Sequence, residues 1–357
     1  MKKALKNYSN YIINKFSNIY IRLVMRRKVK NFISDFDSIE DEYKKDIKKY
    51  WNKFGVRLST DWHMWYSSRN KNRDVRYIPE DIFYCYIEPF YNNIKFANAY
   101  SDKGLYDLWF PNVSKPKTII RNVGGVNYNN EGKIISKKEA VNICNNYKRI
   151  IIKANIESGG GRNICFIEEN DVFDMKESII KAIDDFDKDY IVQEILEQNS
   201  IIKSINPESV NTIRITTFLR NSDVYVISSV LRMGVNGSKV DNGAGGGIAC
   251  GILKNGRLKD VAYDSLGNSY KKHPQGFKFN TCIIPSYEKV VEIAKREHVK
   301  FGHFKIISWD FAIDKDNNPI LIEYNLSLQG INFHQMNNGP LFGDLTESVL
   351  EEVFSHR

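Results

Sequence analysis

The sequence has few cysteines, and none of them forms a CxxC pair. Five dispersed cysteines argue against a disulfide framework or a zinc site and suit a reducing cytosol. The sequence also lacks any run of about 20 uninterrupted apolar residues, which excludes a transmembrane helix of ordinary length. Because 42% of the residues are hydrophobic and 27% are charged, we expect a globular cytoplasmic protein.

Acidic residues are missing from residues 1–30, although this segment carries nine lysines and arginines. These nine account for the whole formal net charge of +9, so the rest of the chain is neutral. A nucleic-acid-binding protein needs a basic stripe on its folded surface, and we therefore expect no nucleic-acid partner.

The basic segment has the spacing of an amphipathic helix. Apolar residues recur at steps of three and four, with basic residues on the opposite face. These apolar residues are Leu5, Tyr8, Ile12, Phe16, Ile19 and Leu23. Two interpretations stay open: a helix docked on its own domain, or a helix peripheral to the inner face of an anionic membrane, where each basic residue adds about 1 kcal/mol.

The rest of the chain divides into three parts. Residues 31–117 have helical, aromatic-rich patterns, and from Thr118 short β-type runs alternate irregularly with helical stretches. Because regular βαβ units are absent, we predict an α+β fold with boundaries at 118–205 and 206–357. The β-type runs are Thr118–Val123, Arg149–Lys153, Ile164–Ile167, Tyr190–Gln193, Thr212–Leu219, Val224–Met233 and Ile248–Leu253.

The strongest chemical signal is a predicted β-hairpin at Ile306–Asn325 that turns at Lys315–Asn318. A turn centred there pairs Asp310 with Glu323 and places Asn325 on the same face. On the apolar face the expected pairs are Trp309–Tyr324, Phe311–Ile322 and Ile313–Ile320. Two facing acids repel each other and favour a bound cation, and oxygen ligands prefer magnesium or manganese to zinc. The alternative is two solvated carboxylates on an exposed face.

A glycine-rich loop separates two predicted strands at Arg149–Ile167. Gly159, Gly160 and Gly161 would let backbone N–H groups close over phosphate oxygens, and Lys153 at the strand end would add a charge. The loop lacks the GKS/T ending of a P-loop, and a strand follows it. An ordinary glycine-rich hairpin turn is the competing interpretation.

A predicted buried strand ends in polar residues at Tyr190–Glu197. Its hinge segment would present Gln193, Glu194, Ile195, Leu196 and Glu197 to an adenine edge and ribose hydroxyls. A solvated strand end is the alternative interpretation.

Two arginines lie within apolar strands, Arg214 and Arg232, and each needs a partner because unpaired burial is costly. Phosphate, a substrate carboxylate or an internal acid would serve. Candidate substrate contacts follow at Asn242 and Gly246, in a glycine-rich loop that could close over an acceptor, and at His273.

Taken in order, these segments resemble the ATP-grasp superfamily, and most closely its sugar-transfer-associated group found among bacterial surface-polysaccharide genes. The closer likeness lies in Ser209–Gly247 and His273–Gly276, and the resemblance covers about Asp81 to Glu352. It implies an ATP-grasp fold, in which two α+β subdomains grip ATP, preceded by a helical N-terminal region.

The resemblance also implies residue roles. Lys153 would touch the α- and β-phosphates, Glu194 with Glu197 would bind adenine and ribose, and Arg214 would stabilise the transferred phosphate. Asp310, Glu323 and Asn325 would hold one or two magnesium ions. Many relatives carry another nucleotide-binding lysine on an earlier strand, where this sequence offers Lys117 or Arg121.

The implied reaction is ligation of a carboxylate and an amine through an acylphosphate, with a sugar or glycan of surface polysaccharide biosynthesis as the expected acceptor. The rival functions are a phosphotransferase on the same scaffold and a membrane-peripheral nucleotide-binding scaffold. A protein kinase is disfavoured because there is no HRD-type catalytic loop.

Overall fold

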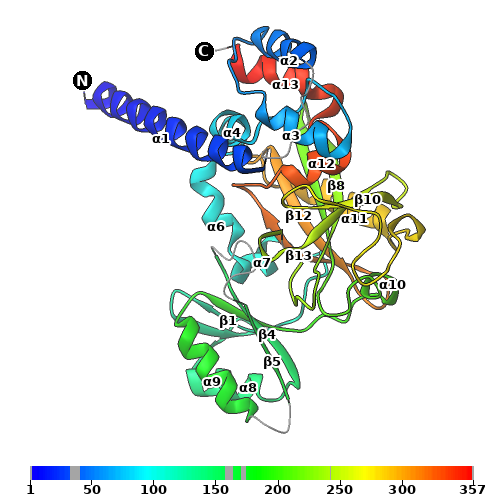
Figure 1. Ribbon diagram of the computed structural model, residues 1–357. Helices are drawn as coiled ribbons and strands as arrows, with labels where there is room; N and C mark the ends of the chain where they lie inside the picture. Colours follow the sequence, from blue (N-terminus) through cyan, green and yellow to red (C-terminus); the bar gives the residue numbers. More distant parts are fainter. Residues whose placement is uncertain (1, 33–40, 157–163, 170–173, 242, 356–357) are drawn as a thin grey trace.

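The computed structural model describes residues 2–32, 41–156, 164–169, 174–241 and 243–355, with side chains described from residue 17 onward except at 244. Helices surround two separate β-sheets, in which all recorded strand pairs are antiparallel (Figure 1). This arrangement confirms the predicted α+β class.

The first sheet has six strands in the order β3-β2-β1-β6-β4-β5. Its strands are β1 Thr118–Val123, β2 Val126–Asn129, β3 Ile134–Ile135, β4 Arg149–Ala154, β5 Ile164–Glu168 and β6 Tyr190–Glu194. Helices α8 (Lys137–Cys144) and α9 (Met175–Phe186) pack on it in the lower part of Figure 1. Helix α8 begins with a capping box between Ser136 and Glu139, which satisfies two backbone N–H groups.

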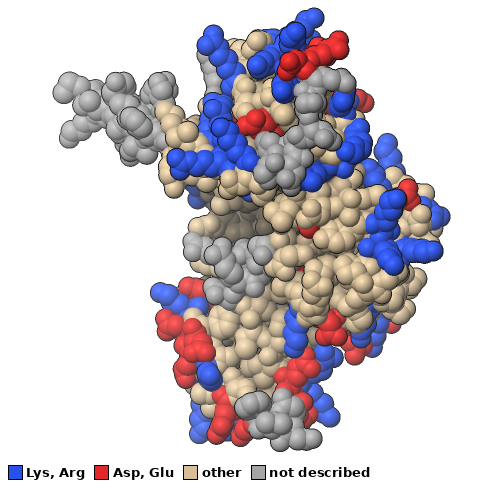
Figure 2. Space-filling view, viewed as in Figure 1, with Lys and Arg blue, Asp and Glu red and all other residues tan. Residues whose placement is uncertain are grey.

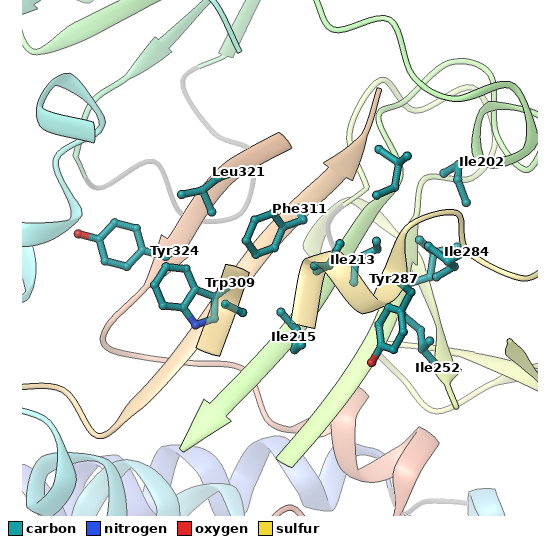
Figure 3. Packing of buried hydrophobic residues seen from close by; sticks show 14 of the residues in the cluster. Ile202, Ile213, Ile215, Ile252, Ile284, Tyr287, Trp309, Phe311, Leu321 and Tyr324 are labelled. Carbon is teal, nitrogen blue, oxygen red and sulfur yellow. The ribbon is translucent and has the colours of Figure 1, made fainter. Parts of the chain in front are cut away.

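The second sheet has seven strands in the order β11-β10-β9-β8-β7-β12-β13. Its strands are β7 Thr212–Arg220, β8 Asp223–Met233, β9 Ile248–Ile252, β10 Leu258–Asp264, β11 Ser269–Tyr270, β12 Ile306–Ile313 and β13 Pro319–Asn325. One face packs on helix α11 (Tyr287–His298) through a core that includes Trp309, Phe311 and Tyr324 (Figure 3). The rings of Trp309 and Tyr324 stack with centroids 5.4 Å apart, which makes the predicted hairpin rigid on its apolar side.

The N-terminal helices pack against the C-terminal ones and also form an aromatic cluster around Trp62, Trp65 and Tyr66. Buried Ile47 and Trp51 share a cluster with Val349 and Leu350, and α2 lies beside α13 in Figure 1. The helical elements of residues 2–117 are α1 Lys2–Phe32, α2 Asp41–Asn52, α3 Asp61–Asn70, α4 Glu80–Ile82, η1 Phe83–Ile87, α5 Glu88–Tyr91, η2 Ile94–Phe96, α6 Ala97–Ser101, η3 Lys103–Leu105 and α7 Tyr106–Trp109. The later ones are α10 Ser200–Lys203, η5 Gly243–Gly245, η6 Phe279–Thr281, α12 Asn332–Asn338, η7 Gly343–Leu345 and α13 Thr346–Phe354.

The predicted hairpin is present, with β13 starting at Pro319, but half of its predicted register is wrong. The pairs Trp309–Tyr324 and Asp310–Glu323 are confirmed. Beyond them the register shifts by one residue. Phe311 then faces Leu321 instead of Ile322, and Ile313 faces Pro319 instead of Ile320. An extra residue in one strand is a β-bulge, and here it frees Ile322 from the apolar face to line a cavity.

The basic N-terminal segment is helical, as predicted, but the two described members of its predicted apolar stripe are not buried against the protein. Ile19 and Leu23 are about half exposed, at 48% and 53%. The helix docks through its other side: Arg22 and Arg26 pair with Asp81, Lys28 pairs with Glu80, and Val29 packs in a buried cluster. Within the described ranges, none of the helices combines the length and apolarity of a membrane span.

Candidate active site

A cavity of about 630 Å³ lies between the two sheets, and Figure 2 shows the molecule hollowed between its upper and lower parts. This volume is within the range of about 300–1,000 Å³ typical of small-molecule sites. The cavity brings together most of the predicted site residues. These are Lys153, Gln193, Glu194, Ile195, Leu196, Arg214, Arg232, Asp310, Glu323 and Asn325.

Asp310 lies at the centre of a row of charges that crosses the second sheet. On β12 it faces Glu323 of β13 on one side and Arg214 of β7 on the other. Its carboxylate receives a two-pronged contact from Arg214, with Nε 2.7 Å from Oδ1, and a further bond of 3.1 Å from Arg232 Nη1. Burial raises the pKa of Asp310 above its usual range, and the two arginines oppose that shift. The internal acid that the strand arginines needed is therefore Asp310.

Glu323 is held by a lysine that the sequence analysis did not single out. Lys103 Nζ lies 3.3 Å from Glu323 Oε2, and Arg214 Nη2 lies 3.9 Å from Oε1. Burial opposes ionisation of Glu323, but the attraction of Lys103 and Arg214 outweighs it and lowers the pKa of this carboxyl to about 2. Glu323 is consequently an anion at neutral pH. It is not one of two solvated carboxylates on an open face, because it lies in the cavity opposite buried Asp310.

The donor set at the hairpin suits a hard divalent cation. Asp310 and Glu323 contribute carboxylate oxygens, and Asn325 contributes an amide whose Nδ2 is buried without a hydrogen-bond partner among the described residues. Because an amide can be placed in either orientation, its oxygen can equally face the cavity. Oxygen-only donors of this kind fit magnesium. Among the described residues no cluster of three His, Cys, Asp or Glu side chains offers a different metal site.

Lys153 is a buried cation that forms no ion pair with the described acids. Its side chain is 8% exposed, and no hydrogen bond or ion pair joins it to the described part of the chain. Burial and the nearby Lys103 lower its pKa to about 8, against a smaller opposing attraction from Glu323. An uncompensated charge in this position is costly unless an anion binds beside it.

The hinge strand β6 runs between β1 and β4 and ends at the cavity. Gln193 is buried and donates from Nε2 to the Pro116 carbonyl at 3.3 Å, while its Oε1 has no partner within the described residues. Apolar side chains from both sheets and from the segment between β6 and β7 line the same cavity. They are Ile151, Ile164, Phe166, Ile195, Leu196, Val210 and Ile322.

Several predicted contacts are not brought to this cavity. Glu197 pairs with Lys315 at 3.3 Å and is exposed. His273 is fully buried, with Nε2 2.9 Å from the Gly234 carbonyl, and burial lowers its pKa, so it has a structural position rather than a loop position open to ligand. Gly246 is absent from the lining. The predictions for Gly159, Gly160, Gly161 and Asn242 fall outside the described residues.

Neither candidate for the second nucleotide-binding cation lines the cavity. Lys117 Nζ pairs with Glu194 Oε1 at 2.7 Å and lies mostly in solvent, and Arg121 pairs with Asp107 at 3.6 Å. Lys103 lines the cavity instead. It lies in the short helical turn η3, between α6 and α7, and therefore has no strand pattern around it that would predict a site residue.

The end of the cavity away from the hinge is built by residues that sequence reasoning missed. Lys28 and Phe32 come from α1, Trp65 from α3, Glu80 from α4 and Phe333 from α12. They are separated by up to three hundred residues in sequence, and no local motif connects them. Only the packing of the N-terminal helices on the C-terminal ones joins them.

Solved structures resemble this chain at low identity. Biotin carboxylase from Campylobacter jejuni, in complex with β,γ-ATP, matches at 13% identity and a TM-score of 0.44, over 72% of this chain and 46% of that one. D-alanyl-alanine synthetase A from Vibrio cholerae matches at 11% and 0.43, over 72% and 66%. N5-carboxyaminoimidazole synthetase from Staphylococcus aureus matches at 10% and 0.40, over 70% and 51%. The chain thus spans about half the length of the first of these, and no curated protein matches it.

A family model provides the assignment. The model for sugar-transfer associated ATP-grasp proteins matches residues 87–349, which include the hinge, both strand arginines and the hairpin. The match is close to the extent expected from sequence, Asp81 to Glu352. By this match the chain belongs to the sugar-transfer associated ATP-grasp family.

Proposed function

We propose that this protein is an ATP- and magnesium-dependent ligase that joins a carboxylate to an amine on a sugar or glycan. Its main support is buried Lys153, whose ammonium forms no ion pair with the described residues and which shares one cavity with the charge row around Asp310. Such a cavity suits a polyanion that binds as a complex with a metal ion. The sugar rests on the description of the family alone.

The nucleotide would lie with its base toward the hinge. An adenine ring fits among the apolar side chains there, and its exocyclic amino group would donate to the unpartnered Oε1 of Gln193. The main chain of Ile195 and Leu196 and the carboxylate of Glu194 would meet the rest of the nucleoside. Lys153 would then contact the phosphates, with the glycine-rich loop as their cover.

Magnesium would be held by Asp310, Glu323 and Asn325, and manganese suits the same oxygen donors. When bound, it would neutralise charge on the phosphates and help to orient them. The residues that remain beside it are Arg214 and Arg232, which would face the transferred phosphoryl group while still holding Asp310. Arginine suits this task because its guanidinium stays charged and can bind two oxygens at once.

In the proposed reaction a carboxylate oxygen of the acceptor attacks the γ-phosphorus, and the bond to the β-phosphate oxygen breaks to release ADP. The amine nitrogen then attacks the acyl carbon, inorganic phosphate leaves, and the amine proton passes to phosphate or solvent. The acceptor would lie at the end of the cavity that Lys28, Phe32 and Phe333 line. Aromatic faces with an adjoining polar pair, Lys28 and Glu80, suit a sugar ring with hydroxyl groups.

Purified protein with ATP, magnesium and paired carboxylate and amine candidates, such as uronic acids and amino sugars, tests the proposal. Ligation predicts an amide product by mass spectrometry, with stoichiometric ADP and phosphate. A stable phosphorylated acceptor without amide would instead identify the phosphotransferase. ATP binding without turnover of any candidate would favour the nucleotide-binding scaffold.

A further inference from the structure

Helix α1 presents an apolar face to solvent. Over its described side chains, Ile19, Tyr20, Leu23 and Val24 are 48%, 69%, 53% and 39% exposed. At 3.6 residues per turn these positions share one broad side of the helix with exposed Arg27 and Lys30. An exposed apolar patch edged with cations is characteristic of helices that lie on membranes.

The opposite side of α1 is anchored, so the helix cannot roll this face inward. Arg22 donates from Nε to Asp81 at 3.1 Å and from Nη2 to the Arg57 carbonyl at 3.2 Å. Lys28 donates to both oxygens of Glu80, at 3.1 and 2.8 Å. Val29 is fully buried. Because Asp81 and Glu80 are themselves buried, breaking these pairs would leave isolated charges in the protein.

The exposed face continues a pattern that the sequence carries further. Ile19 and Leu23 are the last two members of the six-residue apolar stripe that begins at Leu5. The backbone of α1 is one helix from Lys2 to Phe32, without an interruption that would break this spacing. The same segment has nine basic residues and no acid.

We propose that α1 docks this protein on an anionic lipid bilayer. Ile19, Tyr20, Leu23 and Val24 enter the interfacial region, with Arg27 and Lys30 at the level of the headgroups. Charge complementarity selects this occupant: a surface of anionic headgroups matches a segment that has cations and no acids. A second copy of the chain would bring an identical basic segment to the same face and would be repelled.

Docking in this way has a consequence for the cavity. Lys28 and Phe32, one to four turns further along α1, line its acceptor end. The distance along the helix from Ile19 to Lys28 is about 14 Å at 1.5 Å per residue. The bilayer would therefore lie near the end of the cavity that the proposed function gives to the acceptor, and this inference about α1 stands without that function.

Co-sedimentation of the full-length protein with vesicles tests the proposal. We expect binding to vesicles of phosphatidylcholine mixed with phosphatidylglycerol, and at least tenfold weaker binding to phosphatidylcholine alone. Leu23→Asp should weaken binding to the mixed vesicles by about tenfold or more, since it removes apolar area and adds a like charge. Leu108→Asp is the matched control, because Leu108 on α7 is 69% exposed and lies outside α1.

A second pair of measurements separates charge from apolar contact. Arg27→Gln with Lys30→Gln should weaken binding by about fivefold for each charge removed, and added salt should weaken wild-type binding further. Equal sedimentation of wild type and Leu23→Asp would overturn the proposal, as would failure of wild type to bind the mixed vesicles. A wild-type dimer in light scattering that Leu23→Asp abolishes, with no lipid binding, would assign the face to a second copy and also overturn it. Binding of an ATP analogue by every variant shows that the rest of the protein is folded.

Discussion

Replacing Lys153 by methionine should raise the free energy of unfolding of the nucleotide-free protein and weaken its binding of nucleotide. Lys153 is buried and forms no ion pair with the described residues, and burial and Lys103 lower its pKa from 10.5 to about 8 despite the attraction of Glu323. A difference of about 2.5 pKa units corresponds to about 3 kcal/mol of unfavourable free energy for the charged form in the folded state. Methionine has a similar length and no charge, so Lys153→Met removes this penalty.

The sign of the effect depends on pH. Below about pH 8 the lysine is protonated in both states, and the folded state carries the full penalty. As the pH rises from about 8 toward 10.5, the folded protein releases its proton first, and the wild type recovers stability. The stability advantage of Lys153→Met should therefore be about 2–3 kcal/mol at pH 7 and should vanish near pH 10.5.

Nucleotide affinity should change in the opposite direction. A charge-assisted contact to phosphate contributes about 1.5–3 kcal/mol, so Lys153→Met should weaken a magnesium–ATP analogue by about tenfold to a hundredfold. Urea unfolding measures the free energy of unfolding, and isothermal titration calorimetry measures the Kd of the analogue. Lys181→Met, at an exposed position on α9, is the control and should change neither.

Two results would refute this reasoning separately. A Lys153→Met variant less stable than the wild type at pH 7 would mean that a counter-charge compensates the ammonium. Unchanged affinity for the analogue would show that Lys153 does not contact the phosphates, independently of the result for stability.

Three further predictions concern the rest of the cavity and its supports. Asp310→Asn leaves Arg214 without its buried partner. We therefore expect the free energy of unfolding in urea to fall by about 3–5 kcal/mol and the rate of ADP release to fall at least a hundredfold. Retention of both values would exclude the proposed role of Asp310. Buried Glu88, whose carboxylate accepts two backbone N–H groups of the loop after β13, has its pKa raised by burial from 4.5 to about 7. The folded state holds this proton more tightly than the unfolded state does. The wild type should therefore lose up to about 3 kcal/mol of stability as the pH rises from 4.5 to 7. Glu88→Gln should gain stability relative to the wild type over that range. Phe333→Ala should raise the KM of the acceptor identified by product analysis several-fold and leave the Kd of the ATP analogue unchanged; an equal change in both would place Phe333 at the nucleotide.

Local pattern was sufficient for most of the secondary structure and for the centre of the hairpin. The Asp310–Glu323 pair follows from the position of the turn and the two-residue period of a strand, both of which are readable over twenty residues. The register beyond this pair was wrong because a bulge inserts one residue at Ile322 without a glycine or proline to mark it. The bulge matters, since it turns Ile322 from the core into the cavity.

The helix at the N-terminus shows a different limit. Its amphipathic period was readable, but the period does not say which face meets the protein. That choice depends on Asp81 and Glu80, two buried acids that need cations and lie 59 and 52 residues from Arg22 and Lys28, their partners on the helix. A similar reason hid Lys103, which became a site residue only because Glu323 lies beside it.

The sequence by itself determined the α+β class, the family resemblance, the paired acids and the lysine of the nucleotide strand, because each depends on residues close together in the chain. The tertiary structure decided which cations hold those acids, that His273 is enclosed away from the cavity, and that the N-terminal helices build its far end. These features depend on burial and on contacts between distant segments. Burial sets the cost of an unpaired charge, and that cost determines which side chains must meet.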